Sequence, residues 1–409
     1  METPTLSLKD LFQQEFPRIV AVITRQFGVQ HMHAAEDIAS ETFLAAAETW
    51  GIKGIPANPA AWLYLVARQK AIHFWRRDKI YRDKVMPAIT SNTAAEEEID
   101  FSEEHIQDSK LRMIFAVCNP VIASEAQIGL ALRILCGFGI EEIATAFFTN
   151  RETISKRLLR AKDKLRQENI QLEMPADQDI IHRLDNVLHV IYLVFNEGYY
   201  SRTQDQVLRR DLCLEALRLC LQLTAYSPTN TPATNALIAL ICFHASRFAA
   251  RQPEDDTILL YDEQDSTQWD QQLVHQGMHY LALSASGDHL SSYHLEARIA
   301  YWHCIPEDSP AKWEEILLLY NQLLILKNSA AGTLNRLYAK YKVDGAAVAL
   351  KELQALQVPQ NTDYFLLMGA LYEQLDTEKA VKAYQQALST TTIPAEVQHL
   401  ATKIKNLNK

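Results

Sequence analysis

Apolar residues in the middle of the chain follow the pattern of two consecutive amphipathic helices. The first stripe has the i, i+3, i+4, i+7 spacing of one helical face and consists of Ile140, Ile143, Ala144 and Phe147. The second has the same periodicity and consists of Ile154, Leu158, Ala161 and Leu165. Between them, the side chain of Asn150 can accept hydrogen bonds from the first free N–H groups of a new helix. The pattern predicts two short helices joined by a tight polar turn, which is the helix-turn-helix arrangement.

Helical periodicity also fills the second half of the chain. We predict helices with polar connections over 187–202, 211–223, 236–248 and 259–273. Only 12 of the 409 residues are glycine, and neither an Asn-Gly hairpin signal nor a sustained strand alternation occurs. The sequence therefore predicts an all-α fold.

Residues 363–388 resemble a tetratricopeptide repeat, a helix pair with small residues where the helices cross. The expected positions hold Gly369, Tyr372, Ala380, Tyr384 and Ala387, with the connection one residue short. A second, poorer copy lies within residues 313–350. Stacked helix pairs leave a concave face that suits peptide or protein binding. Small residues also occur where any tight helical hairpin crosses, so this pattern alone indicates only a packed helix pair.

Charge is unevenly distributed along this chain, whose formal net charge is −10. Residues 68–84 and 150–166 each hold seven basic and two acidic residues, whereas residues 96–108 hold seven acidic residues and no Lys or Arg. Residues 1–170 contain 21 Lys+Arg and 22 Asp+Glu, so most of the net negative charge lies in the remainder. The order is basic, acidic, basic, and then a long, mildly acidic extension.

The basic stretch 150–166 coincides with the second predicted helix. In a helix-turn-helix, early residues of this helix enter the major groove, and basic residues further out neutralise phosphates. The candidates for base edges are Arg151, Glu152, Ser155, Lys156 and Leu159, and those for phosphates are Arg157, Arg160 and Lys162. A solvated basic helix face would have the same composition, so the stretch alone leaves both interpretations open.

Aromatic and basic residues are interleaved between Asn58 and Arg77. The aromatic residues are Trp62, Tyr64, Phe74 and Trp75, and the basic residues are Arg68, Lys70, Arg76 and Arg77. Aromatic rings can stack on unpaired bases while cations follow the nucleic-acid backbone. The same rings can instead pack in a core, and composition does not decide between the two roles.

Two sequence blocks in this order resemble the extracytoplasmic-function sigma factors of bacterial RNA polymerase. The first block is AAEDIASETFLAAAETW (34–50) followed by NPAAWLYLVARQKAIHFWRR (58–77), and the second is SEAQIGLALRILCGFGIEEIATAFFTNRETISKRLLRAKDKLR (124–166). The resemblance covers about the first 170 residues. It implies that residues 1–80 form region two, which binds core RNA polymerase and melts the minus-ten element of promoter DNA. Residues 81–108 would form an acidic flexible linker, and residues 109–172 would form region four, which binds the minus-thirty-five element.

The resemblance also implies roles for individual residues by position. Those in the polymerase-binding segment are Asp37, Glu41 and Phe43. Those in the minus-ten and melting segment are Asn58, Trp62, Arg68, Lys70, Arg76 and Arg77. Those in the minus-thirty-five helix are Arg151, Glu152, Ser155, Lys156, Arg157, Leu159 and Arg160. Gln69 and His73 depart from residues that are common in the family, which affects the details of minus-ten reading.

Residues 173–409 extend beyond the point where ordinary members of this family end. The strings FNEGY (195–199), DLCLEALRL (211–219) and DEQDSTQW (262–269) resemble the tetratricopeptide-bearing carboxy-terminal domain of one sigma-factor subgroup. We therefore expect a helical, tetratricopeptide-like extension. Its expected role is to regulate the sigma factor in cis or to bind a protein partner, because a fused domain acts at high effective concentration.

Two other classes of function fit parts of the sequence. A helix-turn-helix adaptor would bind duplex DNA and use the extension as a scaffold without engaging polymerase. An enzyme would need the carboxylates of Glu197, Asp262, Glu263 and Asp265, which no nucleophile or base accompanies. We therefore expect neither catalysis nor a cofactor.

The remaining features concern compartment and metal binding. The six cysteines are scattered without zinc-ligand spacing, so buried free thiols and no metal site are expected. No apolar run approaches the ~18 residues that cross a bilayer, and the amino terminus lacks the layout of a secretory signal. The sequence thus predicts a cytoplasmic protein with no membrane partner.

Overall fold

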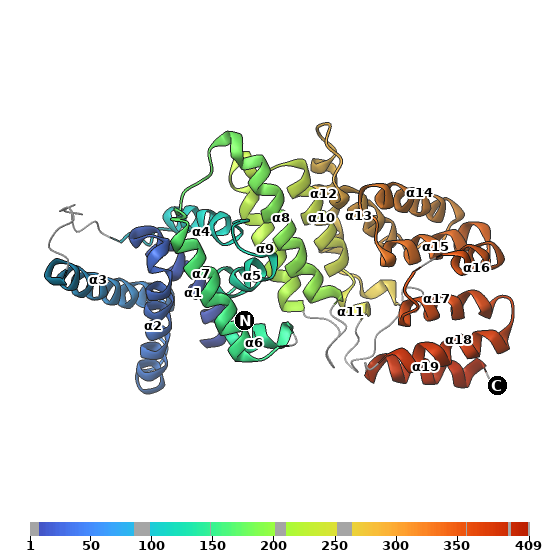
Figure 1. Cartoon of the computed structure of the whole chain (residues 1–409), viewed down its shortest axis with the longest axis horizontal. Helices are drawn as coiled ribbons and strands as arrows, with labels where there is room; N and C mark the ends of the chain where they lie inside the picture. Colours follow the sequence, from blue (N-terminus) through green and yellow to red (C-terminus); the bar gives the residue numbers. More distant parts are fainter. Residues whose placement is uncertain are drawn as a thin grey trace. The chain divides into compact units, whose positions relative to one another are not determined.

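The computed structural model describes residues 8–85, 99–147, 149–200, 210–251, 264–356, 358–391 and 394–407. Within these ranges every regular element is a helix and no β-strand occurs, which confirms the all-α prediction. None of the described helices combines the length and apolar character needed to cross a membrane. The chain divides into two compact units, Met1–Val194 and Phe195–Lys409, whose helices are labelled in Figure 1.

The first unit holds both sequence blocks and the beginning of the extension. Its helices are α1 (Leu8–Phe27), η1 (Val29–His31), α2 (Met32–Lys53), α3 (Pro59–Val85), α4 (Glu103–Val117), α5 (Ser124–Leu130), the short π-helix η2 (Ala131–Leu135), α6 (Ile140–Ala146), α7 (Arg151–Gln167) and the first part of α8 (Asp177–Tyr200). Helices α3 and α4 reach into residues 81–108, the range predicted as a flexible linker. Ser102 begins α4 as its cap, because its Oγ accepts from the backbone N–H of His105.

Helix α1 is the centre of the first unit's core. Its apolar residues Phe16, Ile19, Val20 and Ile23 have the spacing of one helical face, and each is at most 1% exposed. The helix packs against α2, α3 and α4. Burial of such a side chain stabilises a fold by about 1.5–3 kcal/mol, so these contacts of α1 hold α2, α3 and α4 together.

The two helices predicted around Asn150 are present as α6 and α7. The side chain of Asn150 caps α7, since its Oδ1 accepts from the backbone N–H of Thr153 at 2.8 Å. The predicted inner stripe of α7 is buried throughout and comprises Ile154, Leu158, Ala161 and Leu165. Local periodicity and one capping residue thus predicted both helices, but Phe147 lies just after the end of α6 and, like Ile140, is only half-buried.

The start of the extension packs on the helices before it. On α8, the Arg183 guanidinium donates to the backbone carbonyl of Phe115 at 2.7 Å. The side-chain amide of Asn186 donates to the carbonyl of Cys118 and to Oε1 of Gln127, the latter at 2.8 Å. The first turns of α8 therefore belong structurally to the first unit.

The second unit is a succession of packed helices. They are α9 (Arg210–Thr224), η3 (Ser227–Thr229), α10 (Pro232–Ala245), α11 (Phe248–Arg251), η5 (Ser266–Gln268), α12 (Gln271–Ser284), α13 (Ser292–His303), α14 (Pro310–Leu326), α15 (Ala330–Asp344), α16 (Ala346–Ala355), α17 (Thr362–Glu373), α18 (Thr377–Thr390) and α19 (Pro394–Leu407). Consecutive helices from α13 to α19 contact one another, as expected for stacked hairpins.

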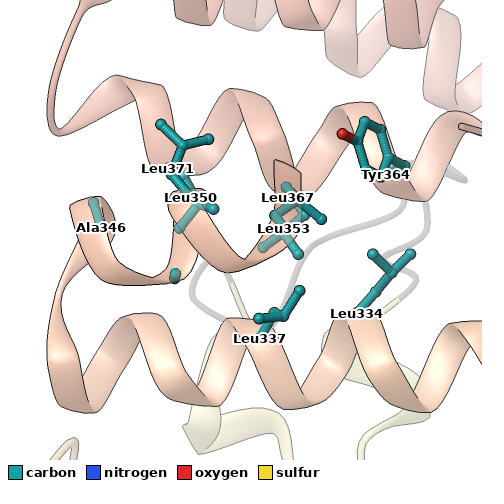
Figure 2. Close-up of a cluster of buried hydrophobic side chains, with 9 residues drawn as sticks. Leu334, Leu337, Ala346, Leu350, Leu353, Tyr364, Leu367 and Leu371 are labelled. Atoms are coloured by element: carbon teal, nitrogen blue, oxygen red, sulfur yellow. The ribbon is translucent and has the colours of Figure 1, made fainter. Parts of the chain in front are cut away.

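A buried cluster joins three of these helices. Figure 2 shows Leu334 and Leu337 of α15 facing Leu350 and Leu353 of α16 and Leu367 of α17. The next pair, α17 and α18, crosses closely at Gly369, where an added Cβ would lie 2.5 Å from Cε1 of Tyr384. A small residue therefore lies at the crossing point, as the repeat pattern predicted.

Candidate nucleic-acid interface

Helix α7 presents a basic face opposite its buried stripe. Arg151, Lys156 and Arg160 are exposed on this face, and Leu159 lies among them with 48% of its surface exposed. An exposed apolar side chain in this position can contact a thymine methyl group in a major groove. Within the first unit, the face predicted to read bases is open.

Several cations of α7 form ion pairs that solvent screens. Arg151 pairs with Glu141 at 3.3 Å, and Lys156 pairs with Glu152 at 2.6 Å, with all four side chains mostly exposed. Exposed pairs of this kind stabilise a protein by roughly 0–1 kcal/mol. Exchanging these carboxylates for DNA phosphates would therefore cost little.

Two further residues of α7 are less exposed than these cations. Arg157 is half-buried, pairs with Glu125 of α5 at 3.1 Å and lies over the ring of Phe147. Ser155 is half-buried as well. Arg157 therefore anchors α7 to its neighbours in addition to any contact with a phosphate.

Lys162 contradicts its sequence-based interpretation in this conformation. It was predicted to reach a phosphate, but it is 8% exposed and its Nζ forms a salt bridge with Oε1 of Glu36 on α2. The other carboxylate oxygen of Glu36 pairs with Nε of Arg133 on η2 at 3.1 Å. Sequence reasoning missed this arrangement, and no local signal marks it, because Arg133 and Lys162 are 97 and 126 residues from Glu36.

Helix α3 carries the residues predicted for the minus-ten segment. Asn58 caps the helix, since its Oδ1 accepts from the backbone N–H of Ala61 at 3.0 Å. Lys70 pairs with Glu41 of α2 at 3.0 Å, and Arg68 is half-buried. Arg76 and Arg77 are exposed, and they are the last residues of α3 whose side chains the structure describes.

The aromatic residues of α3 pack against the protein itself. Trp62 contacts the ring of Trp50 with centroids 5.3 Å apart, and Trp75 stacks on Phe27 at 4.7 Å. Tyr64 donates its hydroxyl to Glu15, and burial together with this hydrogen bond raises the pKa of Tyr64. In this conformation the rings therefore act as packing residues rather than as an open stacking platform.

Helix α2 presents the residues predicted to bind polymerase. Asp37 and Glu41 are exposed on one face, together with Leu44, which is 61% exposed. Phe43 points the other way: it is 5% exposed and its ring contacts Phe12 of α1. In this structure Phe43 is therefore a core residue beneath the exposed face and not part of that face.

The motifs of the extension form core contacts of the second unit. Phe195 and Tyr199 of the FNEGY string are buried, and both rings contact His244 of α10. Arg251 lies over the ring of Tyr199, with 4.2 Å between the guanidinium carbon and the ring centroid. The two aromatic residues of the FNEGY string therefore pack in the core of the second unit.

The carboxylates considered for catalysis are only partly described. Asp262 and Glu263 lie outside the described residues, as does the side chain of Glu197. Asp265 accepts from the backbone N–H of Thr267 at 2.9 Å and begins η5. Across the ranges that the structure describes, no group of three or more His, Cys, Asp or Glu side chains is placed to hold a metal ion. All six cysteines are buried and free, as predicted.

Comparison with known proteins finds two family matches in separate parts of the chain. Residues 11–80, which contain α2 and most of α1 and α3, match the family described as Sigma-70 region 2. Residues 183–285 match a family of unknown function, DUF6596. An uncharacterized protein of Rhizobium meliloti (strain 1021) is 30% identical over 403 residues, which are 96% of this chain and 93% of that protein. No solved structure matches the chain.

Proposed function

This chain belongs to the sigma-70 family of RNA polymerase sigma factors, and we propose that it is a member of the extracytoplasmic-function type that reads two promoter elements. The observation that carries the proposal is the Sigma-70 region 2 match over residues 11–80. A sigma factor has its role in transcription initiation, with core RNA polymerase and promoter DNA as its partners. The finer assignments below are proposals argued from individual residues.

The first block acts as region two. The exposed face of α2 with Asp37 and Glu41 is the proposed contact with polymerase, and Arg76 and Arg77 of α3 are the proposed contacts with the DNA backbone. The Lys70–Glu41 pair, 3.0 Å long, joins the two faces. A polymerase contact at Glu41 would therefore change the ion pair of Lys70, a residue of the minus-ten segment.

The second block acts as region four, with α6 and α7 as a helix-turn-helix on the minus-thirty-five element. Arg151, Glu152, Ser155, Lys156 and Leu159 are the proposed contacts with base edges. The proposed contacts with phosphates are Arg157 and Arg160. Support comes from the exposure of Leu159 amid cations and from the weak, exposed pairs of Arg151 and Lys156.

The extension acts as a regulatory or interaction domain with tetratricopeptide-like helix pairs, and it has no catalytic activity. The tight crossing of α17 and α18 at Gly369 supports the repeat assignment. The hydrogen bonds of Arg183 and Asn186 support a role in cis, because they fix the start of the extension to the end of α4 and to α5 of the second block.

Binding of the purified chain to core RNA polymerase tests the proposal. We expect a stable complex that Asp37→Lys weakens by at least about tenfold, since it reverses an exposed charge on the proposed contact face. The matched control is Glu104→Lys, the same reversal at an exposed position of α4. A chain that binds promoter duplex but never binds core polymerase would be the DNA-binding adaptor instead.

A further inference from the structure

Helix α14 of the second unit has one buried side and one exposed side. Its buried apolar residues, each at most 7% exposed, are Trp313, Ile316, Leu319 and Leu323. They pack against α13 and α15, the neighbouring helices along the chain (Figure 1). This side of α14 therefore belongs to the core of the second unit.

The exposed side of α14 carries large apolar residues in one row. Leu318 is 50% exposed and Ile325 is 85% exposed, and seven residues, or almost two helical turns, separate them. Leu326 is 52% exposed, and Ala330 and Ala331 at the start of α15 are exposed as well. The outer side of a surface helix is ordinarily polar, so a run of exposed apolar residues here indicates a contact surface.

Polar residues lie in a definite order along the same side. Asn321 and Gln322 are exposed between the two apolar residues of the row. Exposed Glu314 comes before the row, and exposed Lys327 comes directly after the helix. Along α14 the order is therefore acidic, apolar, amide, apolar, basic. We call the exposed side from Glu314 to Lys327 the α14 face.

This order is self-complementary when two copies of α14 lie antiparallel. In a two-fold symmetric contact, residue i of one copy meets residue j of the other, and j meets i. An axis between Asn321 and Gln322 places Leu318 opposite the partner's Ile325, and Ile325 opposite the partner's Leu318. The amides then meet at the axis, where each can donate to and accept from the other copy. A polar pair inside an apolar helix contact also fixes the register.

The charges agree with the same orientation. The antiparallel alignment brings Glu314 opposite the partner's residues 327–329, of which Lys327 is the charged one. A parallel alignment would instead place Glu314 beside Glu314 and Lys327 beside Lys327, which is unfavourable. Lys327 pairs with Glu296 of α13 at 3.5 Å, but 48% of its side chain is exposed. Such a pair contributes roughly 0–1 kcal/mol, so Lys327 can turn to a new carboxylate at little cost.

We propose that the α14 face binds the α14 face of a second copy of this chain, antiparallel, to form a two-fold symmetric dimer. One helix per copy makes a small interface, so the dissociation constant should be about 10–100 µM. The inference goes beyond the proposed function, because neither the proposed polymerase contacts nor the proposed DNA contacts lie on this face.

Sedimentation equilibrium of the full-length chain tests the proposal, with no polymerase or DNA present. The chain should change from monomer to dimer as its concentration passes through this range. Leu318→Glu and Ile325→Glu should each raise the dissociation constant at least about tenfold, because each places two carboxylates in the apolar contact. Leu375→Glu is the matched control: Leu375 is 48% exposed between α17 and α18, and its replacement should leave the constant unchanged.

Two results of this experiment would overturn the proposal. A chain that stays monomeric at every concentration would leave a different protein as the occupant of the α14 face. Equal weakening by Leu318→Glu and Leu375→Glu would place the dimer contact elsewhere. Both results are obtained on the free chain, so they leave the proposed role with polymerase untouched.

Disulfide cross-linking tests the orientation, using Leu318→Cys and Ile325→Cys as separate variants. All six native cysteines are buried, so the introduced thiol is the accessible one in each variant. An oxidised mixture of the two variants should give cross-linked dimers that join residues 318 and 325. Each variant alone should stay uncross-linked, because its two thiols lie about 10 Å apart along the helix axis, beyond the reach of a disulfide. Cross-linking within each variant alone, with none between the two, would overturn the antiparallel contact.

Discussion

The ring of Phe101 lies parallel to the ring of Tyr64, with centroids 4.8 Å apart and planes inclined by 8°. Phe101 precedes α4, and Tyr64 belongs to α3, so the stack ties the chain before the second block to the first. Replacing Phe101 with Leu removes the stack while keeping an apolar side chain. We expect the free energy of unfolding to fall by about 1 kcal/mol, measured by urea denaturation.

Leu65→Ala is the control for this variant, because Leu65 is 54% exposed on the same helix. Its effect should stay within about 0.5 kcal/mol. Equal stabilities of Phe101→Leu and wild type would show that the stack contributes nothing.

Gly369→Ala tests the helix crossing in the second unit. The new Cβ would lie 2.5 Å from the ring of Tyr384, which is 1% exposed and cannot move aside without disturbing its neighbours. We expect a loss of about 1–3 kcal/mol in the free energy of unfolding. Gly51→Ala is the matched control: nothing lies within 4 Å of its added Cβ on α2, so a gain of up to about 1 kcal/mol is expected. If both variants shift stability in the same direction, the crossing is not tight.

Arg160→Ala tests the DNA face of α7. Arg160 is exposed and is a proposed phosphate contact, so its loss should weaken binding of promoter DNA about equally for all sequences. The slope of log affinity against log salt should also fall by about 1. Lys53→Ala, which removes an exposed cation at the end of α2, should leave the slope unchanged. An unaltered slope for Arg160→Ala would place this residue outside the DNA contact.

Two buried histidines make the stability of the second unit depend on pH. Burial, with Arg247 and Arg251 nearby, holds the pKa of His244 well below its ordinary value, and burial with Arg247 and Lys312 does the same for His303. The folded state therefore binds fewer protons than the unfolded state below about pH 6.5, where unfolded histidines become charged. The contribution of these neutral histidines to the free energy of unfolding is complete above that pH. It is lost as the pH is lowered, by up to about 1.4 kcal/mol per pH unit for each histidine.

Urea denaturation between pH 7.5 and 5.5 measures this dependence. Trp313 serves as the fluorescent probe, since its ring centroid is 5.8 Å from that of His303. His303→Gln should reduce the slope but not abolish it, because His244 stays buried and the pKa of the buried His294 is lowered as well. A stability that stays constant across this range would contradict the neutral, buried state of both rings.

Local patterns in the sequence predicted the local structure. The stripe from Ile154 to Leu165 and the cap at Asn150 depend on residues within one or two helical turns, so periodicity was enough to place α7 and its exposed face. Gly369 and Tyr384 belong to one helix pair, so their contact was predictable from the repeat pattern.

Contacts between distant segments could not be predicted in this way. The charge of Lys162 indicated a role at a phosphate, but Glu36 neutralises it from 126 residues away. Phe101 lies in an acidic run that indicated a linker, yet its ring is stacked on α3. Phe43 lies beside exposed acids in a docking segment, and only the position of Phe12 on α1 shows that it faces the core. In each case the role of the residue is set by a residue far away in the sequence that it contacts, and its own sequence neighbours do not indicate it.

Promoter-dependent transcription tests the central claim most directly. Core RNA polymerase is combined with the purified chain on DNA fragments from its source genome, and the run-off transcripts are mapped. The account predicts transcripts that start at defined positions only when the chain is present, and that are reduced by Asp37→Lys and Arg160→Ala but not by Glu104→Lys or Lys53→Ala. Transcription that is the same with and without the chain on every fragment would contradict the account.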